Sequence, residues 1–125
     1  MFKIMAFLTK SEDIETRAFI EYYENHHVPL IRSLAPTPIG YKRSYLVRGD
    51  DLNVESGAIS FDVVTELVFP DRAAYLAWGR ALSDSTAGRP IISEDESKFL
   101  DRTRTEAYVV EEHVSSDPAS TPARS

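Results

Sequence analysis

Four stretches of the chain have the hydrophobic pattern of β-strands. Residues 2–9 are mostly apolar, and residues 41–48 carry apolar side chains on both faces. Residues 58–69 alternate most regularly, so that one face is strongly hydrophobic and the other is mixed. Residues 103–114 are rich in β-branched and aromatic residues, which favour strands. We therefore predict four strands over these ranges.

Two stretches between these strands have the spacing of helices. After the first strand, apolar residues recur three and four positions apart and predict a helix over residues 17–27. Pro29 has no amide donor, so a continuation of this helix to residue 34 is expected to be irregular. After the third strand, the apolar spacing predicts a second helix over residues 72–82, capped by the preceding Pro70-Asp71 pair.

A third, short helix is expected before the last strand. The sequence Ser93-Glu94-Asp95-Glu96 matches a capping box, in which the serine hydroxyl and the acidic side chain three residues later each bind a free amide at a helix start. A helix that begins there places Phe99 and Leu100 in the core.

The order β-α-β-β-α-β is that of an α+β, ferredoxin-like fold, a four-stranded antiparallel sheet with its helices on one face. On the third strand, the face that carries Val64 and Val68 would then face solvent. Exposed apolar surface costs about 25 cal/mol per Å². Packing this face against a second copy of the chain removes the cost, so we expect a homodimer whose two sheets form a dimeric α+β barrel.

Composition narrows the class of protein. The 125 residues fit one domain over residues 1–114, and the polar tail over residues 115–125 is expected to be disordered. The formal charge of −6 argues against a nucleic-acid partner, and no apolar run is long enough to span a membrane. Without cysteine the chain has no disulfides and no thiolate nucleophile. A cytoplasmic protein is the expectation.

The candidate chemistry centres on His27, near the end of the first predicted helix. Histidine is the side chain whose ordinary pKa lies nearest neutrality, so it can act as general acid or base. Tyr23 lies one turn earlier on the same face and could donate its phenol hydrogen to a substrate carbonyl. The alternatives are structural: His27 would bind the last helix carbonyls, and Tyr23 would be a core residue. His26 is expected to face solvent.

Two acids of the third strand could support the histidine. Asp62 and Glu66 share a face but lie about 13 Å apart along the strand, so they cannot form a close carboxylate pair. Either could hold the imidazole of His27 or act as an acid of raised pKa inside a cavity. Pairing with arginines of neighbouring strands is the structural alternative.

Aromatic residues are numerous enough to line a cavity for a flat hydrophobic ligand. Most are expected in the core, and the candidates for contact with a ligand are Phe7, Phe19, Tyr41, Tyr45 and Trp78. Adjacent histidines point in different directions on a helix, so the sequence predicts no metal site. Haem binding through either histidine stays open.

Two segments of the sequence resemble segments of a known family. The pattern Phe19-x-x-Tyr22-Tyr23-x-x-x-His27-x-Pro29-Leu30 is similar to the first-helix signature of EthD-domain proteins, which belong to the dimeric α+β barrel superfamily. The segment Asp95-Glu96-x-x-Phe99-x-Asp101 resembles the stretch before the last strand in many of them. The order of elements agrees over residues 2–114.

The resemblance implies a small cavity for a hydrophobic or aromatic compound, without metal or organic cofactor, and carries the family histidine onto His27. EthD itself accompanies a cytochrome P450 system for fuel-ether degradation. Similar domains isomerise lactones, or dehydrate, decarboxylate or cyclise polyketide-like compounds. The leading expectation is a cofactor-independent lyase or isomerase. The alternatives are a non-catalytic carrier or accessory protein for an oxygenase, and a cofactor-free oxygenase.

Overall fold

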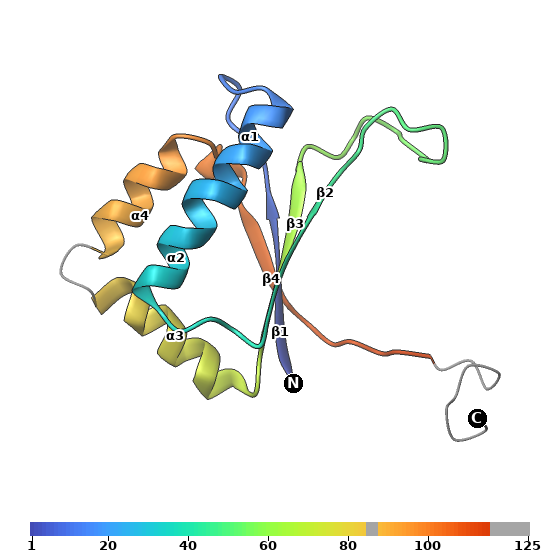
Figure 1. The fold of residues 1–125 in the computed structure, drawn as a ribbon. Coiled ribbons are helices and arrows are strands. Elements are labelled where there is room, and N and C mark those ends of the chain that lie inside the picture. Colours follow the sequence, from blue (N-terminus) through green and yellow to red (C-terminus); the bar gives the residue numbers. More distant parts are fainter. Residues whose placement is uncertain (85–87, 116–125) are drawn as a thin grey trace.

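The computed structural model describes residues 1–84 and 88–115 (Figure 1). The predicted disordered tail lies outside this part of the chain, apart from its first residue. In chain order the elements are β1 (Phe2–Leu8), α1 (Thr16–Tyr22), η1 (Tyr23–His27), α2 (Val28–Leu34), β2 (Gly40–Tyr45), β3 (Val63–Phe69), α3 (Arg72–Asp84), α4 (Gly88–Ser97), η2 (Arg102–Arg104) and β4 (Glu106–Val110).

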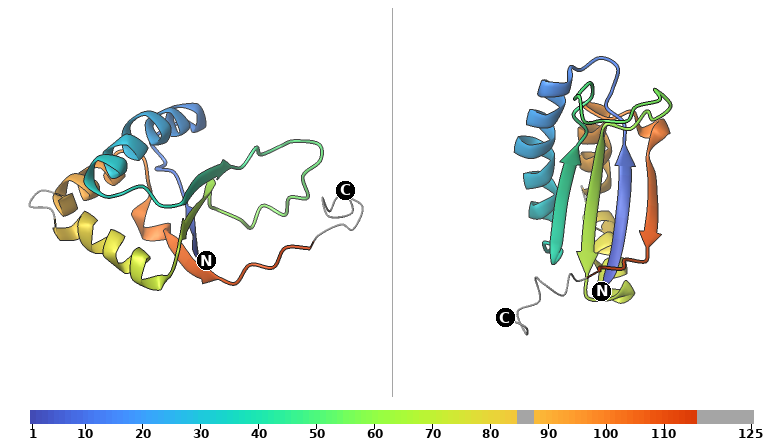
Figure 2. Two further views of the ribbon diagram at one scale, coloured as in Figure 1. Left: turned by 60° about the horizontal axis from the view of Figure 1, so that its bottom comes forward. Right: turned by 90° about the vertical axis from the view of Figure 1, so that its right-hand side faces the viewer.

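The four strands form one antiparallel sheet in the order β2-β3-β1-β4. All the helices lie against one face, and the connection between β2 and β3 extends away on the other side (Figure 2). This is the ferredoxin-like arrangement, so the predicted α+β fold is confirmed. No helix in the described part of the chain is long and apolar enough to cross a bilayer.

The alternation of β3 determines which of its side chains enter the core. Val63, Thr65, Leu67 and Phe69 are buried under the helices, as the predicted hydrophobic face requires. The largest fully buried side chains are those of Tyr23, Phe19, Phe99 and Val63. Phe99 and Leu100 are both buried, which confirms their predicted place in the core.

The first helix is continuous from Thr16 to Leu34 but contains a π-helical segment over Tyr23–His27, which we call the π-turn. Within it the amide of Val28 donates to the carbonyl of Tyr23, five residues earlier. Pro29 follows at the start of α2; it has no amide hydrogen, and in a regular α-helix its ring would collide with the carbonyl four residues before it. The predicted irregular continuation is confirmed.

Several predicted boundaries were wrong. α4 begins at Gly88, so Ser93 lies inside the helix and the capping-box prediction fails. Pro90 is tolerated because the first turn of a helix needs no internal amide partners. Strands β3 and β4 are shorter than predicted, because residues 58–62 precede the paired part of β3, η2 occupies the expected start of β4, and residues 111–114 follow its end. The predicted cap of the second helix is confirmed, because Asp71 Oδ1 accepts from the amide of Ala74 at 2.8 Å.

Candidate proton-transfer site

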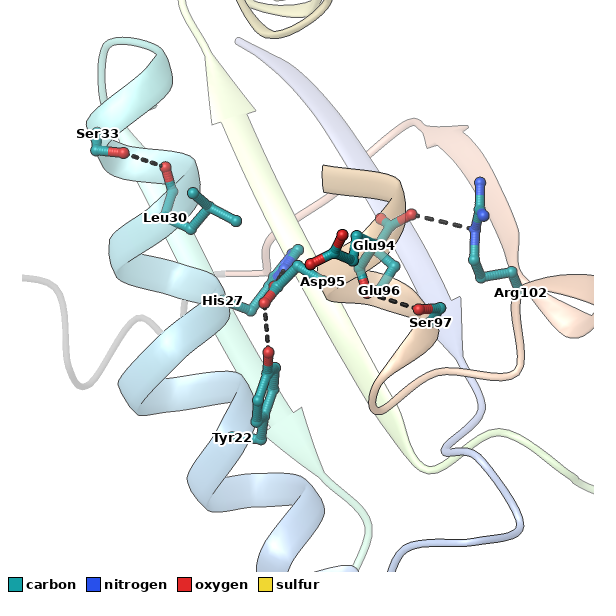
Figure 3. A network of polar contacts seen from close by, with 9 residues as sticks. All are labelled: Tyr22, His27, Leu30, Ser33, Glu94, Asp95, Glu96, Ser97 and Arg102. Atoms are coloured by element: carbon teal, nitrogen blue, oxygen red, sulfur yellow. Dashed lines mark hydrogen bonds and ion pairs between the residues drawn. The ribbon is translucent and has the colours of Figure 1, made fainter. Parts of the chain in front are cut away.

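A buried histidine–carboxylate pair connects the first helix to α4 (Figure 3). His27 Nδ1 lies 2.8 Å from Asp95 Oδ2, and both residues are buried. The hydroxyl of Tyr22 donates to the other carboxylate oxygen, Asp95 Oδ1, at 2.5 Å. The ring of Phe99 packs beside the imidazole, with 5.0 Å between centroids. The structure therefore places a titratable ring against an apolar side chain with its orientation fixed by a carboxylate.

The π-turn brings Tyr22 and His27 to the same carboxylate. Side chains five residues apart on a regular α-helix point about 140° apart. The wider turn between these two residues reduces that divergence, and both reach Asp95. His26 remains exposed, as predicted, and stacks on the ring of Tyr22 at 4.8 Å. Because the helix continues past His27, the alternative that this histidine binds the carbonyls of a helix end is wrong.

The hydrogen bonds indicate which nitrogen carries the hydrogen when the His27 imidazole is neutral. With Asp95 as a carboxylate, both of its oxygens accept, so the hydrogen lies on Nδ1 of His27. Nε2 forms no hydrogen bond with the described residues and is left with the lone pair that a general base needs. Burial and the hydrogen bond to Asp95 raise the pKa of Tyr22 to about 12, so this phenol remains a donor at neutral pH.

A second polar group lies beside the histidine, over the centre of the sheet. The Tyr23 hydroxyl is hydrogen-bonded to Thr65 Oγ1 at 2.6 Å, and the Tyr23 ring meets the His27 ring edge-on at 5.3 Å. Burial raises the pKa of Tyr23 well above its usual range. Burial also raises the pKa of Tyr41 to about 12, although Arg43 and Tyr23 oppose the effect. Both phenols are therefore neutral at neutral pH and can donate a hydrogen bond, and that of Tyr23 belongs to a ring in contact with the imidazole.

The carboxylate that holds His27 is not one of the two that the sequence suggested. Asp62 accepts from the backbone amide of Lys10 at 2.8 Å, and Glu66 pairs with Lys3 at 2.6 Å on the helix-free face of the sheet. The supporting acid is Asp95 instead. The signal that could have identified it was its place in the segment before the last strand that resembles EthD proteins, which was assigned to a helix cap.

The aromatic residues predicted to contact a ligand lie on both faces of the sheet. Tyr41 from β2 and Trp78 from α3 pack between the sheet and the helices, on the side of His27. Trp78 Nε1 is buried and finds no hydrogen-bond partner in residues 1–84 and 88–115. Phe19 is fully enclosed. Phe7 lies on the opposite face, so it cannot share a cavity with His27 within one chain. Tyr45 packs on Phe19 from the helix-covered face, and Phe7 packs on Phe61 and Tyr108.

One further carboxyl lies near the pair. Burial raises the pKa of Glu96, while the charge of His27 and that of Arg102, 3.4 Å away, lower it. Glu96 and Arg102 line a surface hollow of about 500 Å³ together with Leu82, Ser83, Ile92 and Ser93. Among the residues that the structure describes, no three His, Cys, Asp or Glu side chains are grouped closely enough to hold a metal ion.

One protein family matches most of the chain. Residues 11–103 match the EthD domain. An EthD family protein of Bacillus halodurans is 24% identical, with 90% of this chain and 100% of that chain covered and a TM-score of 0.61. A protein of Arabidopsis thaliana is 10% identical, with coverages of 93% and 99% and a TM-score of 0.62.

A third solved structure, HapK from Hahella chejuensis, is 16% identical, covers 97% of this chain and 100% of its own, and has a TM-score of 0.57. At these identities the likeness is one of fold. None of the curated proteins matches the chain.

Proposed function

Because the chain belongs to the EthD family, we propose that it is a small enzyme that transfers a proton within a hydrophobic carbonyl compound, without a cofactor, through His27. The observation that carries this proposal is the buried His27–Asp95 pair with the Tyr22 hydroxyl on its second oxygen. A general base needs one ring nitrogen able to accept a proton, and Nε2 of His27 is bound by none of the described residues. The proposed reaction class is that of an isomerase or lyase.

In the proposed reaction Nε2 of His27 removes a proton from the carbon beside a carbonyl. The electron pair of the broken C–H bond then forms an enolate, and the imidazolium is stabilised by Asp95. An isomerase returns the proton to a different carbon, and a lyase gives it to the leaving group. Either path restores the neutral imidazole, so no oxidant or reductant is needed.

The phenols support the same reaction. Tyr23 and Tyr41 have raised pKa values and remain protonated, so each can donate a hydrogen bond to an oxygen that gains negative charge. Tyr23 would exchange its bond with Thr65 for one with the substrate. Together with Tyr45 and Trp78 they offer aromatic surface on the side of His27, which favours a small hydrophobic or aromatic substrate.

Exchange with solvent tests the proposal without knowledge of the product. A panel of lactones and of β-carbonyl compounds is incubated with the protein in deuterium oxide, and the proton spectrum of each compound is followed. We expect at least one compound to lose an acidic C–H signal faster than it does without protein. If no compound exchanges, but one binds, the protein is a carrier and the catalytic proposal fails.

We also propose that the chain forms a homodimer through the helix-free face of the sheet. Half-buried apolar side chains of Met5, Val64 and Val68 lie on this face, and Phe7 forms an aromatic cluster at one end of it. The exposed Tyr108 extends the same surface onto the edge strand β4. A second copy would remove this apolar area from water.

The dimer is tested by sedimentation. The wild-type protein is expected at twice the chain mass of 14.1 kDa. Val64→Asp places a charge in the centre of the proposed interface and is expected to give a folded monomer. Leu76→Asp, at a half-exposed position on α3, is the control and should leave the dimer intact. A wild-type monomer, or a Val64→Asp dimer, would contradict the proposed interface.

A further inference from the structure

An ion pair connects the π-turn to the edge strand β2. Arg43 binds Glu24 through two nitrogens, with Nε 2.9 Å from Oε2 and Nη2 2.6 Å from Oε1. The Tyr45 hydroxyl donates to the same Oε2 at 2.5 Å. Arg43 also donates to the carbonyl of Tyr41 and lies over its ring, 4.7 Å from the centroid. Three alternate residues of β2 are thus engaged on the side of the π-turn.

The neighbouring strand holds the adjacent residue of the same turn. Arg43 and Thr65 are directly paired across β2 and β3. Arg43 binds Glu24, and Thr65 is hydrogen-bonded to Tyr23, so two facing residues of the sheet hold two consecutive residues of the π-turn. These contacts fix both the position and the rotation of the turn relative to the sheet.

The π-turn needs such support. A π-helical turn is rare in proteins, and the bond from the Val28 amide to the Tyr23 carbonyl does not by itself fix how the turn is oriented over the sheet. If the turn rotated away from β2, the side chains of Tyr22 and His27 would shift relative to α4 and could not both reach Asp95. The hydrogen bonds from Arg43 lower the pKa of Glu24, and the hydrogen bond from Tyr45 and the charge of Arg43 lower it further against the effect of burial, which keeps this acid ionised at neutral pH.

We infer that Arg43 is a positioning residue for His27: its two-point contact with Glu24 holds the π-turn against β2 in the orientation that directs His27 and Tyr22 to Asp95. The expected effect on turnover rests on the proposed function. The expected effect on the position of His27 does not depend on any reaction. Lysine cannot replace the arginine, because it offers a single point charge where the guanidinium offers two parallel hydrogen bonds.

The test is the imidazole N–H proton of His27, observed by nuclear magnetic resonance in the protein without substrate. In the wild type, its hydrogen bond to Asp95 is expected to give a slowly exchanging downfield signal. Arg43→Gln should broaden or remove this signal and lower kcat by about 10- to 100-fold, with a smaller change in KM. Compared with Arg43→Gln, Arg43→Lys should recover only part of the His27 signal and only part of kcat. Lys42→Gln is the matched control, since Lys42 lies on the opposite face of β2 and should change neither.

An unchanged His27 signal in Arg43→Gln would overturn the inference. If that variant fails to fold, Tyr45→Phe removes a single hydrogen bond to Glu24 and should shift the signal; no shift there would overturn the inference equally. A different outcome would contradict the proposed function alone. If the signal responds as expected and no variant, wild type included, shows turnover, then the positioning is real and the catalytic proposal is wrong.

Discussion

Replacement of His27 by glutamine is expected to lower turnover by about 10²–10⁴-fold, the usual contribution of a well-placed proton-transfer group. Glutamine retains a hydrogen-bond donor for Asp95 but cannot accept a proton at neutral pH. Since His27 is buried, His27→Ala would leave a void and an unpaired carboxylate, and its loss of activity could reflect unfolding. The conservative change avoids this, and its effect on the free energy of unfolding is expected to be about 1 kcal/mol.

The measurement is the solvent-exchange rate of the best substrate, with thermal unfolding as the check on the fold. His26→Gln is the control, because His26 is adjacent in the chain but exposed. It should retain wild-type turnover. A folded His27→Gln protein with unchanged turnover would show that the histidine is structural.

The same variant separates the rival functions. A carrier would bind its ligand equally well before and after the substitution, and its affinity would not depend on pH near neutrality. An enzyme that uses His27 as base should instead show a rate that depends on pH near neutrality, since only the neutral ring accepts a proton. A cofactor-free oxygenase would consume oxygen during turnover, which an oxygen electrode detects.

Replacement of Asp95 by asparagine is expected to lower turnover by at least about 10²-fold, since in Ser-His-Asp sites the same change at the acid that orients the histidine costs about 10⁴-fold. The side chain keeps its size, but its amide can donate to Nδ1 of His27 and so favour the tautomer with the hydrogen on Nε2. That tautomer cannot act as the base. The substitution also removes the negative charge of Asp95 that stabilises the imidazolium.

Three other variants complete this experiment. Tyr22→Phe removes one hydrogen bond to Asp95 and should cost only a few-fold in kcat, about the effect of 1 kcal/mol. Asp62→Asn and Glu66→Gln alter the two acids that lie away from His27 and should leave the rate within about twofold, since neither contacts the imidazole. A large loss in either of them, with Asp95→Asn active, would contradict the assignment of the supporting acid.

Local patterns in the sequence were enough to predict the strands and helices and the faces that they bury. The alternation of β3 predicted which of its side chains are buried, and the helical spacing placed Tyr23 and His27 on one face of the first helix. Both are periodic signals that depend on neighbours along the chain, and burial of the apolar face enforces them. The boundaries were less well predicted, because Ser93-Glu94-Asp95-Glu96 has the residues of a cap but lies inside a helix that begins at Gly88.

The composition of the site was decided by tertiary structure. Asp95 is far from His27 in the sequence and reaches it only because α4 packs beside the π-turn. Tyr22 joins the same carboxylate because the π-turn changes the direction of its side chain relative to His27. The sequence by itself determined the order of the elements and singled out His27 as the candidate for proton transfer. Only the packed structure selected its partners, because contacts between distant segments depend on how helices and sheet fit together, which no local periodicity encodes.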